Sequence, residues 1–259
     1  MQKINDIDFF LFYEDSRSIY LKEYLEHYSK TNLIDINGPI TNKIKSTNKS
    51  RYFILPIRYN ENVQNYFDGI KSQLDENDIV FNDRNKNKDD IFIHRQLLDE
   101  TALVENAVLT AEAIISIATT ESNIALLDKK VIITGFGRIS KAVAKRLSGF
   151  ECQIKIIARN NEQIKQAKNL GYLADNIKTD SFVGYDFIIN TIPFEIFNEN
   201  HIIMLDKPAL FIETASIKSG IEKSDNFSLH KYVFAPGLPG KFSPKSAAEI
   251  IAKSILRNI

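Results

Sequence analysis

The stretch Val131-Ile-Ile-Thr-Gly-Phe-Gly-Arg-Ile-Ser140 decides the fold of this chain. Its apolar start, Val131 to Ile133, has the composition of a buried parallel strand. Gly135 and Gly137 follow at once, and the residues from Ser140 to Leu147 place their apolar side chains at helical spacing. A strand, a glycine turn and a helix in this order predict the first unit of a dinucleotide-binding domain.

Each glycine of this turn has its own role in such a domain. Gly135 can supply the tight turn, and Gly137 lets a pyrophosphate approach the backbone at the helix N-terminus. The third position is Ser140, whose hydroxyl could bond a phosphate and whose size predicts slightly looser packing of helix on strand. The alternative is a turn that binds no ligand. We predict that the cofactor contacts are Gly135, Phe136, Gly137, Arg138 and Ile139.

The composition is that of an ordinary globular protein. The chain has 259 residues, 44% hydrophobic and 25% charged, and its 33 basic and 33 acidic residues give a formal net charge of zero. This balance argues against a nucleic-acid surface or a polybasic membrane patch, and it fits a homo-oligomer or a protein with a partner. We also see no apolar stretch of membrane-spanning length. The single cysteine and the lack of a visible signal peptide predict a cytoplasmic protein.

Alternating strand and helix patterns predict an α/β fold. We expect a Rossmann-type doubly wound parallel sheet with a smaller N-terminal α/β domain, in a two-domain, dehydrogenase-like architecture. The N-terminal domain is predicted at 1–100, an interdomain helical segment at 101–127 and the NAD(P)-binding domain at 128–243, with the last helix, 244–258, returning to the N-terminal domain.

The individual elements follow from the same patterns. Strands are expected at 8–13, 33–36, 52–57, 78–81, 131–133, 153–158, 186–190, 209–213 and 232–235. Helices are expected at 18–28, 67–74, 98–120 (as one helix or two), 140–147, 162–170, 198–205 and 244–257. The segment 236–241, rich in proline and glycine, is expected to be a loop.

The end of the second strand of the nucleotide domain predicts the cofactor. An NAD site needs an acidic residue there for the free ribose hydroxyl, whereas an NADP site has a group that tolerates phosphate. The strand ends in Ala158-Arg159-Asn160 without a carboxylate. Arg159 could grip the 2′-phosphate or stack on adenine, so we favour NADP over NAD, with Arg159 and Asn160 at the adenosine. The alternative is a solvated arginine.

Two later strand ends offer contacts to the nicotinamide half of the cofactor. Thr191, Ile192 and Pro193 follow one strand, and Ser216 follows the next. The carboxyl ends of parallel strands meet at the edge where ligands of such folds bind. The alternative is that these residues only terminate strands.

Candidate catalytic and substrate residues are less strongly marked. Thr110 and Glu112 lie on the interdomain segment, where Glu112 could act as a general base or polar anchor. Lys241, Lys245 and Arg17 could bind a carboxylate substrate. We assign Glu112 and Lys241 to catalysis and Arg17, Thr110 and Lys245 to substrate binding, although each could be only a solvated surface residue.

Several kinds of chemistry leave no signal in the sequence. The four histidines have no metal-binding spacing, so no metal is expected, and neither a P-loop nor a nucleophile elbow is present. Without an evident acid–base pair, hydride transfer is favoured over hydrolysis.

Three segments together resemble the A subunit of dipicolinate synthase, an enzyme of spore-forming bacteria. They are 106–115, the turn Gly135-Phe-Gly-Arg138 and, most specifically, 235–250. The chain departs from the family pattern at Ala113, at Ser140 and in the stretch Ser216–Gly220, which lacks a proline–glycine pair.

The resemblance implies NADP-dependent oxidation of dihydrodipicolinate to dipicolinate, for dipicolinic acid biosynthesis in sporulation. It also implies that the partner is a flavoprotein-like B subunit and that both act in the mother-cell cytoplasm. Two alternatives stay open. One is an NADP-dependent dehydrogenase of another small carboxylate substrate, and the other is a non-catalytic dinucleotide-binding scaffold subunit.

Overall fold

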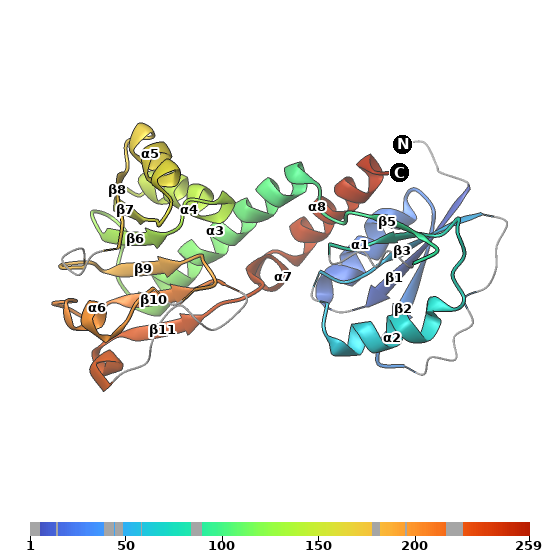
Figure 1. The fold of residues 1–259 in the computed structure, drawn as a ribbon, viewed down its shortest axis with the longest axis horizontal. Coiled ribbons are helices and arrows are strands. Elements are labelled where there is room, and N and C mark those ends of the chain that lie inside the picture. Colours follow the sequence, from blue (N-terminus) through green and yellow to red (C-terminus); the bar gives the residue numbers. More distant parts are fainter. Residues whose placement is uncertain are drawn as a thin grey trace. The chain divides into compact units, whose positions relative to one another are not determined.

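The chain forms two compact units, each built on one parallel sheet (Figure 1). Unit 1 comprises Met1–Glu105 and Ser243–Ile259, and unit 2 comprises Asn106–Phe242. The computed structural model describes residues 6–13, 15–38, 44, 49–57, 59–83, 90–177, 182–194, 196–215 and 225–259. The predicted α/β class with a Rossmann-type sheet is confirmed.

Unit 1 contains a five-stranded parallel sheet in the order β2-β1-β3-β4-β5. Its elements are β1 (Ile7–Tyr13), α1 (Ser16–Glu26), β2 (Lys30–Asp35), β3 (Ser50–Ile54), α2 (Glu61–Lys71), β4 (Ile79–Phe81), β5 (Ile93–Arg95) and α8 (Pro244–Arg257). Because side chains alternate along a strand, Phe9 and Leu11 of β1 enter one core while Phe10 and Phe12 enter another. Residues of α1 and α8 complete the first core, and those of α2 complete the second.

The last helix of the chain is part of unit 1. α8 packs along α1, and Ser243 and Pro244 stand at its N-cap and first helical position. The other end is fastened to Asp99, whose carboxylate accepts hydrogen bonds from the Arg257 guanidinium at 2.7 and 2.9 Å. Asp99 also accepts a bond from the Ala102 N–H, so one carboxylate links the start of α3 (Glu100–Ser122) to the end of α8.

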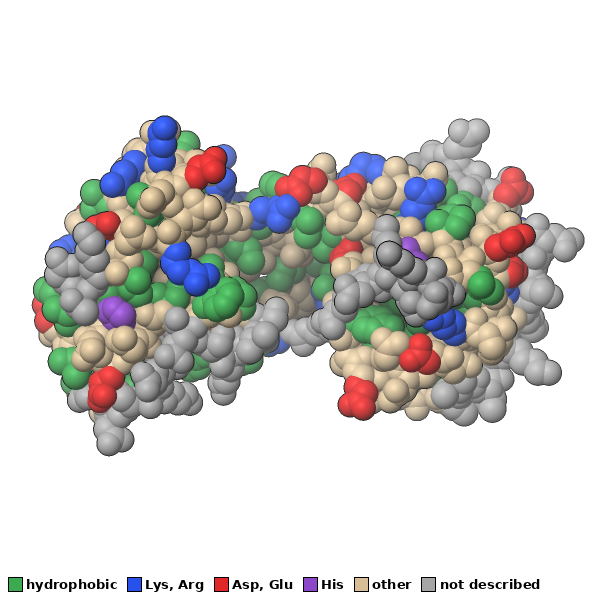
Figure 2. Space-filling model, in the orientation of Figure 1, with side chains coloured by type: hydrophobic (Ala, Val, Ile, Leu, Met, Phe, Trp, Pro, Cys, Tyr) green, Lys and Arg blue, Asp and Glu red, His purple; other side chains and the backbone are tan. Residues whose placement is uncertain are grey.

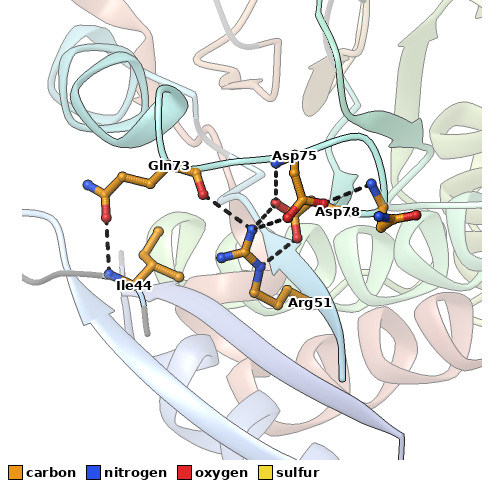
Figure 3. Close-up of polar contacts among 6 residues, drawn as sticks. Ile44, Arg51, Gln73, Asp75 and Asp78 are labelled. Atoms are coloured by element: carbon orange, nitrogen blue, oxygen red, sulfur yellow. Dashed lines mark hydrogen bonds and ion pairs between the residues drawn. The ribbon is translucent and has the colours of Figure 1, made fainter. Parts of the chain in front are cut away.

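A buried ion pair joins β3 to the turn before β4 (Figure 3). The Arg51 Nε donates to Asp78 Oδ1 at 2.7 Å, and its Nη2 donates to Asp75 Oδ2 at 3.0 Å and to the Gln73 carbonyl at 3.2 Å. Arg51 and Asp78 are both buried. The cluster lies at the amino ends of its strands, opposite the edge where parallel sheets bind ligands, so we assign it a structural role.

Unit 2 contains a six-stranded parallel sheet in the order β11-β10-β9-β6-β7-β8. Its strands are β6 (Lys130–Thr134), β7 (Gln153–Ile157), β8 (Leu173–Asp175), β9 (Phe187–Asn190), β10 (Leu210–Glu213) and β11 (Lys231–Phe234). Its helices are α4 (Arg138–Ser148), α5 (Asn161–Asn169), α6 (Glu199–Ile203), α7 (Leu238–Phe242), the 3₁₀ helix η2 (Asp225–Leu229) and most of α3. This is the doubly wound strand order with its switch point between β6 and β9.

α3 is a single helix of 23 residues. Among the described residues it is the one helix long and apolar enough, by length and composition alone, to cross a membrane. The expectation that no segment approaches that length is therefore wrong for α3. Its apolar side chains have another explanation, because Ala111, Ile114 and Ala118 are buried in the core of unit 2.

Three predicted details differ from the structure. A loop was expected at 236–241, but this is wrong from Leu238 on, because α7 begins there. The edge strands β5 and β8 were not predicted, since each has three residues and exposes an apolar side chain, Ile93 or Leu173. The helix expected from 67 begins at Glu61, because the Asn60 side chain caps it by accepting from the Val63 N–H.

Acidic and basic side chains are interspersed on the face of each unit drawn in Figure 2. This mixture accords with the formal net charge of zero.

Candidate functional site

In the glycine turn after β6, the fold requires glycine at position 135 but not at position 137. Gly135 has φ +74°, and a Cβ there would lie 2.7 Å from the Cγ2 of Ile192. Gly137, the N-cap of α4, has φ −82°, and a Cβ there would meet no atom of the described residues within 4 Å. Gly135 is thus fixed by conformation and packing, whereas the bare backbone at Gly137 faces open space at a helix N-terminus. That arrangement fits a pyrophosphate.

The other residues of the turn divide between core and surface. Phe136 is buried and packs edge-on against Tyr172, with ring centroids 6.1 Å apart. Its predicted cofactor contact can therefore come only from its backbone. Ile139 packs partly buried against the same core, and Arg138 is exposed.

Ser140 serves the fold instead of a ligand phosphate. Its side chain is fully buried, and its Oγ lies 3.1 Å from the Thr134 carbonyl and 2.8 Å from the Oγ1 of Thr191. The expected phosphate contact is corrected, because the buried hydroxyl is engaged within the fold, where it fastens the first turn of α4 to β6 and to the loop after β9. The looser packing stays a prediction.

A buried polar network closes the carboxyl ends of β6, β9 and β10. Asn190 donates through Nδ2 to Glu213 Oε2 at 2.7 Å and to the Ile192 carbonyl at 2.9 Å, and its Oδ1 accepts from the Thr134 hydroxyl. Thr134, Asn190 and Glu213 are at most 1% exposed. The network fixes the loop after β9, because both the carbonyl and the N–H of Ile192 bond to Asn190.

Sequence reasoning did not assign roles to Asn190 and Glu213. The available signal was a polar residue at the last position of a buried apolar strand, which occurs at Thr134, Asn190 and Glu213 alike. The register aligns Glu213 with Asn190 on neighbouring strands. Burial, together with the Glu213 carboxylate, raises the pKa of Tyr232 on β11 to about 12, so this phenol stays neutral at physiological pH.

Arg159, at the end of β7, is exposed, and its guanidinium carbon lies 4.6 Å from the ring centroid of Phe194. The following residue, Asn160, caps α5 by accepting from the Glu162 N–H at 2.8 Å. Its side chain is thus engaged within the fold, while the Arg159 side chain extends across to the loop after β9.

The structure brings several predicted contacts to one edge of unit 2. Thr191 bonds to β6 through its N–H and its hydroxyl, Ile192 touches the glycine turn, and Pro193 is exposed. The turn, the Thr191–Pro193 loop and Arg159 thus follow β6, β9 and β7, adjacent strands of one sheet. Ser216 lies outside the described residues.

The predicted catalytic and substrate residues are divided between the units. In unit 2 the Thr110 hydroxyl donates to the Asn106 carbonyl at 2.9 Å within α3. Glu112 is exposed and forms an ion pair with Arg146 at 3.1 Å, and Lys241 on α7 is exposed. In unit 1, Lys245 is exposed on α8.

Arg17 is the remaining predicted substrate residue, and it lies in unit 1. It is buried and forms a bidentate pair with Asp15 at 2.7–3.0 Å. It lines a small pocket at the carboxyl ends of β1 and β3. In the described part of the chain no group of three or more histidine, cysteine or acidic residues could hold a metal ion.

Comparison with known proteins relates this chain to dinucleotide-dependent dehydrogenases. Residues 94–218 match the family model described as D-isomer specific 2-hydroxyacid dehydrogenase, NAD binding domain. The A subunit of dipicolinate synthase from Bacillus subtilis (strain 168) is 27% identical over 153 residues, 58% of this chain and 51% of that protein. The resemblance to the dipicolinate synthase A subunit is confirmed. The matched region spans about half the length of this curated relative.

Solved structures show the same two-unit fold. The dipicolinate synthase A subunit from Bacillus halodurans has a TM-score of 0.80 at 17% identity, covering 99% of this chain and 98% of that one. Its counterpart from Bacillus subtilis has a TM-score of 0.78 at 20% identity, covering 99% and 96%. The chain therefore has a nicotinamide-dinucleotide-binding domain of the dehydrogenase type, in an architecture shared with the dipicolinate synthase A subunit.

Proposed function

We propose that this chain is an NADP-dependent oxidoreductase that oxidises dihydrodipicolinate to dipicolinate (pyridine-2,6-dicarboxylate). The observation that carries the cofactor choice is Arg159 at the end of β7. It replaces the acidic residue that would bind a free ribose hydroxyl, and within the described part of the chain its guanidinium has no carboxylate partner. The substrate is inferred from the resemblance to the dipicolinate synthase A subunit.

The residues present fit a nicotinamide dinucleotide. The backbone of Gly137 and the first N–H groups of α4 would hold the pyrophosphate, because among the described residues no atom lies within 4 Å of where a Cβ of Gly137 would stand. Thr191 and Ile192 would border the nicotinamide ribose from a loop that Asn190 holds in place. When bound, NADP⁺ supplies the acceptor for the hydride that leaves the substrate.

The proposed reaction does not require a strong general base. The dihydropyridine loses a hydride and a proton, and the product gains an aromatic ring, so much of the driving force is intrinsic. Glu112 would accept the proton directly or through water, and Lys241 would orient the reacting ring. Arg17 and Lys245 in unit 1, and Thr110 in unit 2, are each kept as a candidate contact to a substrate carboxylate.

We further propose that this chain forms a homo-oligomer and works with a flavoprotein-like B subunit. Both would act in the mother-cell cytoplasm during sporulation. These proposals are supported by the resemblance and, for the oligomer, by the near-neutral charge.

A calorimetric titration of the purified chain with NADP⁺ and NAD⁺ tests the cofactor choice. We expect tight NADP⁺ binding, much weaker NAD⁺ binding, and loss of the difference in Arg159→Ala. The second step is an assay of dihydrodipicolinate oxidation in the presence of the B subunit. Turnover of a 2-hydroxy acid, with none of dihydrodipicolinate, would instead support a dehydrogenase of another carboxylate substrate.

The second candidate is a non-catalytic dinucleotide-binding scaffold, and one observation favours it. Glu112 is exposed and its carboxylate is already engaged in an ion pair with Arg146. Glu112→Gln and Lys241→Ala distinguish the two functions. If neither variant lowers the activity of the assembled complex while partner binding persists, the catalytic assignment of these residues fails.

A further inference from the structure

Phe194 is an exposed aromatic residue with a specific neighbour. It stands in the loop after β9 with 54% of its surface exposed. The guanidinium carbon of Arg159, from the end of β7, lies 4.6 Å from its ring centroid. The two residues are 35 positions apart in sequence (194 − 159), so this contact is made by the fold and not by local chain geometry.

Arg159 differs from the paired arginines of the chain. Arg17, Arg51, Arg146 and Arg257 each form an ion pair with a carboxylate. Among the residues that the structure describes, the Arg159 guanidinium has no such partner, and its contact is with the Phe194 ring. Its charge is therefore positioned by an aromatic face without being neutralised.

The contact limits how a ligand can approach the Arg159 guanidinium. A guanidinium is planar, and its five N–H groups point outward in that plane. The guanidinium carbon lies 4.6 Å from the Phe194 ring centroid, and a base stacked between the two groups would require roughly 7 Å, twice the usual contact distance. A base therefore has no room between Arg159 and Phe194, whereas the N–H groups at the guanidinium edge can meet an anion, and a phosphate accepts this fork of donors in a bidentate manner.

The loop that carries Phe194 is held firmly enough to position it. Ile192, two residues earlier, bonds to the Asn190 side chain through both its N–H and its carbonyl. Asn190 is in turn held by the buried Glu213 carboxylate at 2.7 Å. Pro193 then limits the backbone directly before Phe194, so the ring is placed by the same network that closes the strand ends.

We propose that Phe194 is a specificity-determining residue that holds the Arg159 guanidinium edge-on to the 2′-phosphate of NADP. This inference rests on the proposed function, since it takes NADP as the cofactor. Phe194 acts through Arg159 and is therefore a positioning residue. Without the ring the charge remains, but its orientation is no longer fixed.

The magnitude of the effect follows from the strength of an exposed cation–π contact. Phe194→Leu, which keeps an apolar side chain but removes the ring, should raise the Kd for NADP⁺ roughly two- to fivefold. The Kd for NAD⁺ should not change, and Phe194→Tyr should behave as the wild type. Arg159→Ala should weaken NADP⁺ binding by about tenfold or more, because it removes the charged hydrogen bonds themselves.

The experiment is calorimetric titration of the full chain with NADP⁺ and NAD⁺, with circular dichroism to confirm folding. The variants are Phe194→Leu, Phe194→Tyr, Arg159→Ala and a double variant that combines Arg159→Ala with Phe194→Leu. Phe150→Leu is the matched control, because Phe150 is also an exposed phenylalanine of unit 2. If Phe194 acts through Arg159, the double variant should bind NADP⁺ no more weakly than Arg159→Ala alone.

The outcomes separate this inference from the proposed function. If Arg159→Ala weakens NADP⁺ binding and Phe194→Leu does not, NADP specificity stands and the role of Phe194 is overturned. Equal weakening of NADP⁺ and NAD⁺ in Phe194→Leu also overturns it, since the ring would then serve the part common to both cofactors. If the wild type does not prefer NADP⁺, the proposed cofactor fails and this inference fails with it.

Discussion

The hydroxyls of Ser140 and Thr191 lie 2.8 Å apart and join the first turn of α4 to the loop after β9. Both oxygens also lie within hydrogen-bond distance of the Thr134 carbonyl, Thr191 at 2.7 Å and Ser140 at 3.1 Å. Two hydroxyl protons cannot serve three contacts. The distances favour donation from Thr191 to the carbonyl and from Ser140 to Thr191, a chain that links β6, α4 and β9.

This chain of hydrogen bonds predicts energetic coupling between the two residues. Ser140→Ala and Thr191→Val should each lower the free energy of unfolding by about 1 kcal/mol or more, because each leaves a buried partner less well bonded. The double variant should lose less than the sum, with a coupling energy of about 1 kcal/mol. Urea denaturation followed by circular dichroism measures all four proteins, and strict additivity would contradict the linkage.

The sequence predicted those parts of the fold that leave a local pattern. The apolar run Val131–Ile133 and the glycines after it identified β6, the turn and α4, because a buried parallel strand and a ligand-binding turn both constrain composition. β5 and β8 were missed because three-residue edge strands carry no periodicity. α7 was missed because proline and glycine normally indicate a turn, and here both lie within a single helical turn.

The sequence predicted only those site residues whose position follows from the neighbouring residues in the chain. Gly135, Gly137 and Arg159 stand at strand ends that sequence patterns identify. The Asn190–Glu213 hydrogen bond and the contact of Arg159 with Phe194 join strand ends 23 and 35 residues apart (213 − 190 and 194 − 159). Such pairs depend on strand order and register, which one sequence does not specify.

The Arg51–Asp78 pair should contribute strongly to the stability of unit 1. Asp78→Asn removes one charge from a buried pair, and we expect a loss of about 3–5 kcal/mol because the remaining guanidinium stays buried. Lys22→Ala is the matched control, because the Lys22–Glu26 pair is far more exposed than the Arg51–Asp78 pair and should contribute less than about 1 kcal/mol. If the two substitutions lowered the free energy of unfolding in urea equally, burial would not explain the contribution of the Arg51–Asp78 pair.

Two histidines should make unit 2 sensitive to mild acid. Burial lowers the pKa of His201 and of His230 below the ordinary 6.5, and the Nδ1 of each accepts a backbone N–H, from Asn198 and Ala209 respectively. Below pH 6.5 these histidines are therefore protonated in the unfolded chain but stay neutral in the folded chain. Their contribution to the free energy of unfolding is fully present above pH 6.5 and is lost as the pH falls through the lowered folded-state pKa values.

Urea denaturation at pH 7.5 and 5.5 measures this effect. The free energy of unfolding should be lower at pH 5.5, and the difference should shrink when His201 and His230 are both replaced by glutamine, which can still accept a hydrogen bond. A difference of the same size in the variant would assign the acid sensitivity to other groups.

Cys152 should react slowly in the folded protein. Its Sγ donates to the Leu126 carbonyl at 3.2 Å, and burial together with the Asp186 carboxylate raises its pKa from the ordinary 9.0 to about 11. Because the thiolate is the reactive form, ionisation alone should slow alkylation by iodoacetamide at pH 8 by roughly 100-fold relative to the urea-unfolded chain. Comparable alkylation rates in the folded and unfolded chain would contradict the raised pKa of the Cys152 thiol.

Gly135 and Gly137 provide the sharpest separation of folding from ligand binding. Gly135→Ala introduces a Cβ 2.7 Å from the Ile192 methyl group at a positive φ, so we expect a loss of stability of about 1–3 kcal/mol or more. Gly137→Ala introduces a Cβ into open space at φ −82°, and the free energy of unfolding should stay within about 0.5 kcal/mol of the wild type.

The binding of dinucleotide should be weakened in Gly137→Ala even though its stability is kept. Gly137→Ala should fold normally and yet bind NADP⁺ at least about tenfold more weakly, because its methyl group would occupy the space proposed for the pyrophosphate. Denaturation and calorimetry on the same samples give both quantities. Normal NADP⁺ binding by Gly137→Ala would contradict the proposal that the pyrophosphate binds at this turn. Unfolding of Gly137→Ala would mean that the fold itself needs glycine at this position.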